Sequence, residues 1–202
     1  MTTTSNPKLA WALATDSSVR CAPGPWDDIV SGGRCIMTSL EHKAEYARIY
    51  GAIQQLERDS QELAAIGHVL CNADTEQCNQ WLDMASGAVF RRVASAIPNW
   101  DDNKAWRLAK KERVEHLVKV ALMERSEDLS GERASWGPEK IKAIMESWFG
   151  ISIVVLQWQR DWMPVWSLIQ VVIDRLESEA MQPIEDEIVK AKRLRELDRE
   201  AA

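Results

Sequence analysis

The sequence has no long apolar run, and its first residues lack the pattern of a secretory leader. No stretch approaches the roughly twenty apolar residues that a spanning helix needs, and the mean hydropathy is -0.31. The opening Met-Thr-Thr-Thr-Ser-Asn-Pro has no basic segment followed by an apolar one. These absences argue against a spanning helix, and we expect a cytoplasmic protein with no membrane partner.

Cysteine is also scarce. Four cysteines in 202 residues are too few for a disulfide framework, and we expect them to be reduced in the cytoplasm. Thirteen residues separate Cys21 from Cys35 and six separate Cys71 from Cys78, whereas zinc sites pair close ligands as Cys-x2-Cys. We therefore expect no bound metal and no other cofactor.

The motifs of common enzyme families are missing. There is no glycine-rich phosphate loop, no nucleophile elbow and no His-Glu-x-x-His pair. His42, His68 and His116 are dispersed, and His68 borders an apolar stripe typical of a core histidine. Asp101 and Asp102 are interpreted as acids at a helix start. The sequence predicts a protein that is not an enzyme and has no small-molecule substrate.

Positive charge is in the minority, with 25 Lys and Arg against 31 Asp and Glu. A net charge of -6 argues against a protein that coats nucleic acid, although a local basic patch can still bind it. The densest such patch has five basic residues against only Glu112. Its members are Lys104, Arg107, Lys110, Lys111 and Arg113.

Tryptophan, in contrast, is abundant. The chain has ten tryptophans and only two residues each of Phe and Tyr. Four of the ten, Trp148, Trp158, Trp162 and Trp166, lie close together in the sequence. Large rings fill gaps where helices cross, and they also anchor partner proteins at binding hot spots. Both roles are open for these residues.

Helical periodicity and turn residues predict an all-α protein, a multi-helix bundle with a C-terminal helix-turn-helix and a long closing helix. Four regions are expected. They are an irregular or partly disordered segment at 1–37 with a short helical piece near Leu9 to Leu13, a helical N-terminal part at 38–125, the helix-turn-helix and closing helix at 138–182, and an amphipathic C-terminal helix at 183–202.

Three helices are predicted within 38–125. The first begins with a capping box of Thr38 and Glu41 and carries an apolar stripe to Leu70, with Ser60 in its one gap. It packs within the chain or pairs with a second copy as a short coiled coil. The second helix is stopped by Pro98, and the third runs from about Asn103 to Met123.

The helix-turn-helix is predicted around Gly150. Pro138 suits the first position of a helix, and Gly150 is a natural left-handed stop. Ser152 then caps a second helix, which would enter a DNA groove. The run Ile151 to Leu156 is also β-branched enough for a short buried strand, and a plain helical hairpin in a core remains the alternative.

Polar and basic side chains around this turn suit DNA. The candidate base contacts are Ser152, Gln157 and Arg160. The candidate backbone contacts are Lys140, Lys142, Lys104, Arg107, Lys110 and Lys111. Gln can read adenine, and Arg can reach guanine or phosphate. Ile153 and Val154, however, make an apolar reading face, and Asp161 would repel phosphate.

The closing helix is expected to start at Pro164 and to be interrupted by Pro183. Acids come first and bases later in the segment beyond, which favours a separate amphipathic helix. Such a terminal helix docks on the body, frays, or serves as a dimer arm. The sequence does not fix the oligomeric state.

Two neighbouring segments are Arg-Asp-Trp-Met-Pro-Val-Trp-Ser-Leu-Ile at 160–169 and Glu-Ser-Glu-Ala-Met-Gln-Pro-Ile at 177–184. Together they resemble the C-terminal end of bacteriophage late-gene antitermination proteins of the Q type. Residues 65–70 and 111–122 also resemble pieces of such phage regulators. One branch of that family carries a zinc module with Cys-x2-Cys pairs, which this sequence lacks.

The resemblance implies a regulator that binds double-stranded DNA beside a phage late promoter. It would load onto paused host RNA polymerase in the bacterial cytoplasm and promote read-through of terminators. The region around Gly150 would contact DNA, and the N-terminal helices would contact the polymerase. The alternative, from a different class, is an all-helical interaction module that inhibits or recruits a host protein without binding DNA.

Overall fold

The computed structural model describes residues 4–15, 40–71, 78–127 and 135–201, and this part of the chain contains eight helices and no strand. The predicted all-α class is therefore confirmed. The helices are α1 (Pro7–Thr15), α3 (Leu40–Asp59), α4 (Gln61–Leu70), α5 (Cys78–Ala96), α6 (Leu108–Ser126), α7 (Pro138–Phe149), α8 (Trp158–Asp161) and α9 (Met163–Ala201). None of them is both long enough and apolar enough to cross a membrane.

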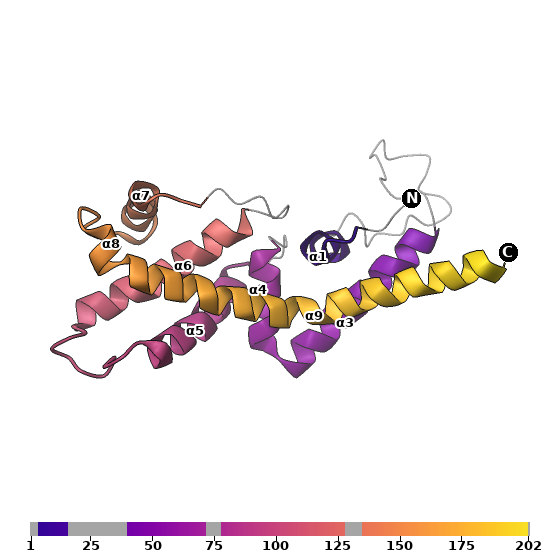
Figure 1. Ribbon diagram of the computed structural model, residues 1–202, viewed down its shortest axis with the longest axis horizontal. Helices are drawn as coiled ribbons and strands as arrows, with labels where there is room; N and C mark the ends of the chain where they lie inside the picture. The colour runs from indigo at the N-terminus through magenta and orange to yellow at the C-terminus, as the bar shows by residue number, and fades with distance from the viewer. Residues whose placement is uncertain (1–3, 16–39, 72–77, 128–134, 202) are drawn as a thin grey trace.

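The 39-residue helix α9 runs along most of the length of the molecule (Figure 1). Helices α1, α3, α4, α5, α6 and α8 all pack on it, while α7 packs on α6. A continuous buried stripe on α9 forms the axis of the core. Its members are Ile169, Ile173, Leu176, Ala180, Ile184 and Ile188. Each fully buried aliphatic side chain of this kind stabilises the fold by roughly 1.5–3 kcal/mol.

Helix α1 contains the short helical piece predicted near Leu9 to Leu13, and the rest of 1–37 beyond Thr15 lies outside the described residues. The ring of Trp11 is completely buried against α4. It occupies a notch at Gly67, where an added Cβ would overlap the ring. Close approach of the two helices therefore depends on the missing side chain at Gly67.

Ser60 divides the helix predicted from Thr38 to Leu70. Helix α3 ends at Asp59, and Ser60 caps α4 by accepting a hydrogen bond from the Leu63 amide at 3.4 Å. The prediction of one continuous helix is wrong, because the polar side chain in the gap of the stripe satisfies the start of a new helix. Thr38 lies outside the described residues.

Pro183 does not interrupt the closing helix, so the expected break before 183–202 is wrong. Proline inside a helix removes one hydrogen bond and costs about 3 kcal/mol. Ile184 and Ile188 continue the buried stripe beyond it, and α9 packs on α3. Burial of these two side chains offsets the cost of the proline.

The third predicted helix begins later than expected, at Leu108. Pro98 ends α5 as predicted, and turns then occupy the following residues, with Asn99 at a positive φ of 55°. Asp102 accepts a hydrogen bond from the Lys104 amide at 2.8 Å. Asp101 and Asp102 therefore belong to this turn, at least six positions before α6 begins, and not to the first turn of the helix.

The second helix of the predicted helix-turn-helix is not formed. Gly150 ends α7 at φ 66° as predicted, and the Ile151 amide donates to the carbonyl of Met145 at 3.1 Å. Residues 151–157 then form neither helix nor strand, and α8 has only four residues. The β-branched run from Ile151 to Val155 disfavours helix, so the chain lacks a recognition helix here.

Candidate nucleic-acid interface

A basic hollow of about 490 Å³ lies where the start of α6 faces the 151–157 segment and α8. Its lining residues are Lys104, Ala105, Arg107, Ala109, Lys110, Arg113, Ser152, Val154, Asp161 and Trp162. Four of the candidate DNA contacts, Lys104, Arg107, Lys110 and Ser152, meet here. Residues almost fifty positions apart thus form one surface.

The linking segment, residues 151–157, is held against α6 by packing and by one charged hydrogen bond. Ile153 is buried in the core, and the Arg113 guanidinium donates from Nε to the carbonyl oxygen of Ser152 at 3.0 Å. The Ser152 hydroxyl donates to Glu146 at 2.7 Å. These contacts fix the position of Ser152 at the edge of the hollow, where its side chain already has a partner.

The start of α6 is strongly positive. Its N-cap is Arg107, no side chain caps its free amides, and its first turn contains no acid. The start of α4, in contrast, has the cap Ser60 and the acid Glu62. Because a helix start carries a partial positive charge, basic residues there are unfavourable until an anion binds.

Two tryptophans position the lysines of this surface. The ammonium group of Lys110 lies 4.2 Å from the ring centroid of Trp106, and that of Lys111 lies 5.4 Å from the centroid of Trp100. The two rings contact each other with centroids 5.0 Å apart. Cation–π contacts of this kind restrict the lysine side chains, so less conformational entropy is lost when they bind a phosphate.

Among the described residues the basic groups of the hollow form no salt bridge, although, besides the hydrogen bond from Arg160, the positive charge of Lys110 helps to lower the pKa of Asp161. In the described part of the chain, no carboxylate lies within 4 Å of the charged groups of Lys104, Arg107 or Lys110. Asp161 does line the hollow, but its carboxylate accepts from Arg160 at 2.7 and 3.2 Å. The hydrogen bond from Arg160 lowers the pKa of Asp161, and the same bond raises the pKa of Arg160.

The other candidate contacts are not brought into the hollow. Arg160 is paired with Asp161, and Gln157 lies exposed immediately before α8. Lys140 stacks over Trp136, with its ammonium 3.8 Å from the ring centroid, and Lys142 is half-buried on α7. Lys111 does not line the hollow either, and its ammonium lies over Trp100. Of the nine predicted contacts, the structure therefore brings four together and leaves five outside the hollow.

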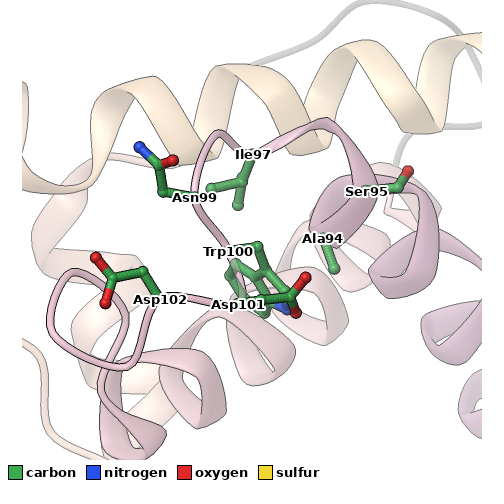
Figure 2. A pocket seen from close by; sticks show the side chains of 7 residues that line it. All are labelled: Ala94, Ser95, Ile97, Asn99, Trp100, Asp101 and Asp102. Atoms are coloured by element: carbon green, nitrogen blue, oxygen red, sulfur yellow. The ribbon is translucent and has the colours of Figure 1, made fainter.

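A second pocket borders this surface and has the opposite character. Its lining residues are Ala94, Ser95, Ile97, Asn99, Trp100, Asp101 and Asp102, as Figure 2 shows. Two carboxylates in this turn make the pocket unsuitable for a phosphate. The turn therefore marks where the basic surface ends, only two residues before Lys104.

Three features of the interface do not follow from the predicted site residues. Arg113 belongs to the basic patch but also ties the linking segment to α6. Trp100 and Trp106 hold lysines, and the four-residue spacing from Trp106 to Lys110 is a signal that sequence inspection can use. Leu108 at the start of α6 and Leu156 in the linking segment are exposed, although apolar residues at these positions would ordinarily be expected to pack in the core.

Comparison of the chain with models of protein families, with characterised proteins and with solved structures gives no match.

Proposed function

We propose that this protein is a cytoplasmic, non-enzymatic regulator that binds double-stranded DNA through the basic hollow. The observation that carries the proposal is the convergence of Lys104, Arg107 and Lys110 at the uncapped start of α6, without carboxylate partners among the described residues. Contacts to phosphate oxygens position a protein on DNA and supply most of its affinity for any sequence.

The proposed role is transcription antitermination in a phage-infected cell, with host RNA polymerase as the second partner. The support is the resemblance of residues 160–169 and 177–184 to the Q-type proteins. Because no recognition helix follows Gly150, DNA would be held by its backbone rather than by a helix in the major groove. Transcription across a terminator, with and without the protein, tests this role, and unchanged read-through contradicts it.

Binding to a fluorescently labelled duplex, followed by anisotropy at low salt, tests the DNA proposal. The test variant changes Lys104, Arg107 and Lys110 to Glu. The matched control changes Lys192, Arg193 and Arg199 to Glu, which makes the same charge change on exposed positions near the end of α9. We expect the control to bind DNA far more tightly than the test variant. Equal binding by both would contradict the proposed site.

A second candidate function is a protein-interaction module that does not bind DNA. It is favoured by Trp148 on α7, which is 68% exposed, while Trp158, Trp162 and Trp166 are buried in the core. An exposed tryptophan is a typical anchor at a protein interface. Absence of DNA binding together with loss of a protein partner in a Trp148→Ala variant would favour this function.

A further inference from the structure

One exposed apolar side chain lines the basic hollow, and two more lie within two positions of its lining residues in the sequence. Leu108 is 83% exposed, Val154 is 70% exposed and Leu156 is 89% exposed. Val154 itself lines the hollow, and Leu108 lies between two lining residues. Exposed leucines and valines gathered beside a charged site, rather than scattered singly, indicate a surface that is covered by a ligand.

From Ile151 to Val155 the linking segment presents its side chains alternately toward the core and toward solvent, and Leu156 and Gln157 then form an exposed turn. Ile153 is buried, whereas Ser152, Val154 and Leu156 are exposed. Ser152 and Val154 both line the hollow, and Leu156 follows two positions later, in a turn where the Trp158 amide donates to the Val155 carbonyl at 3.0 Å. The amides of residues 152–155 make no hydrogen bond within the described part of the chain.

We propose, building on the DNA-binding function above, that the linking segment is an apolar wedge that enters the minor groove of the bound DNA. Leu156 and Val154 would insert at a base step, unstack it and bend the duplex. Lys104, Arg107 and Lys110 would hold the phosphates beside the groove.

The conformation of the segment selects the minor groove. The major groove is about 12 Å wide and admits a helix, whereas the minor groove is only about 6 Å wide. A non-helical segment with exposed leucine suits the narrow groove, and proteins that bind there commonly insert apolar side chains between base pairs. The absence of a recognition helix after Gly150 therefore favours binding in the minor groove.

Charge complementarity favours DNA as the occupant. The apolar side chains adjoin several basic groups that converge on one hollow, and a phosphate backbone beside a groove supplies both a dense negative charge and apolar base faces. An acidic polypeptide with an apolar anchor would offer the same two chemistries. The experiment below separates the two.

The test measures binding and bending in one sample. A duplex carrying a donor and an acceptor at its two ends reports binding by anisotropy and bending by energy transfer. We expect the wild-type protein to raise energy transfer as it saturates the duplex. A Val154→Ser/Leu156→Ser variant should lose most of that rise while its affinity falls less than about tenfold, because the phosphate contacts remain.

The matched control is Leu197→Ser, at a 61% exposed leucine near the end of α9. It should bind and bend as the wild type does. All three substituted positions are exposed, so the variants are expected to fold, and circular dichroism checks this.

Each remaining outcome is decisive. Binding without a change in energy transfer, or full bending by the double variant, would overturn the wedge while leaving DNA binding intact. No binding by the wild-type protein at low salt would overturn the proposed function and the wedge with it. If the double substitution weakens binding to a labelled oligoglutamate peptide that carries one leucine but leaves DNA bending unchanged, the apolar residues serve an acidic polypeptide and the wedge is wrong.

Discussion

Around Trp11 the molecule is closed to solvent, whereas around the start of α6 it leaves charged and apolar side chains exposed. The sealed region, which we define by Trp11, Gly67, His68 and Cys71, has all four residues buried. Burial raises the pKa of the Cys71 thiol, which keeps it neutral and unreactive. The basic hollow lacks this protection, and its exposed groups contribute little to the core.

The two regions use aromatic rings differently. In the sealed region the imidazole of His68 stacks on Trp81 at 4.8 Å between centroids, contacts Trp11 edge-on at 5.3 Å, and pairs with Glu57 at 2.8 Å. Near the hollow, Trp100 and Trp106 instead hold lysines at the surface. We therefore expect substitutions in the sealed region to lower stability and, under the proposed function, those at the hollow to lower DNA binding.

Replacing Trp11 by Ala should give the largest effect on stability. Removal of a fully buried tryptophan costs about 3–5 kcal/mol of unfolding free energy, because the cavity does not close completely. Denaturant unfolding measures this loss. A loss of less than about 1 kcal/mol in unfolding free energy would contradict the tight packing of Trp11. If the folded variant still binds DNA as the wild type does, the sealed region serves stability and not binding.

Gly67→Ala should destabilise the fold by about 1–3 kcal/mol, because its Cβ would overlap the Trp11 ring. The matched control is Gly51→Ala in α3, where nothing lies within 4 Å of the new Cβ. In the control, alanine should stabilise the helix by about 0.5–1 kcal/mol. Thermal unfolding of both variants measures the difference in stability, and equal effects of the two substitutions would contradict the close contact between Gly67 and Trp11.

Glu124→Gln tests a buried carboxylate that joins α6 to the rest of the chain. Glu124 is 6% exposed and accepts from the Trp136 amide at 2.6 Å and from the Gln170 side chain at 2.9 Å. The amide of glutamine would face one of these donors, so we expect a loss of roughly 1 kcal/mol in unfolding free energy. A variant as stable as the wild type would show that the carboxylate is replaceable.

The smallest effect is expected from Arg160→Ala, which exposes Asp161 at the edge of the hollow. Its pKa is held below the ordinary value by the Arg160 hydrogen bond and should rise toward that value in the variant. The stabilisation from this depressed pKa is present above the unfolded pKa and is lost as pH falls through the folded pKa. Carboxyl chemical shifts during an acid titration measure the change, and an unchanged Asp161 pKa would contradict the pairing.

Short-range signals predicted several elements of the fold well. Pro98 and Gly150 end their helices because one lacks an amide hydrogen and the other adopts a left-handed conformation without strain. Pro183 and Ser60 were harder to interpret. Whether a proline breaks a helix or a serine starts one depends on the tertiary contacts around it, and those of α9 with α3 are not visible in a local pattern.

Part of the site was predicted and part was not. The basic patch from Lys104 to Arg113 was visible as a charge cluster, whereas Ser152 was expected on a second helix and instead lies in the non-helical linking segment, lining the same hollow as Lys104, Arg107 and Lys110. Pairing of Arg160 with its neighbour Asp161 and stacking of Lys140 over Trp136 depend on side-chain geometry. Sequence spacing therefore found the charges but not which of them are free to bind.

The salt dependence of DNA binding is the most direct test of the basic hollow. The logarithm of the binding constant should fall linearly with the logarithm of salt concentration, with a slope of about -0.9 for each phosphate neutralised. Changing Lys104, Arg107 and Lys110 to Glu should remove about three units of that slope, whereas the control at Lys192, Arg193 and Arg199 should leave it unchanged. A wild-type slope near zero, or the same slope in both variants, would contradict binding of DNA at the start of α6.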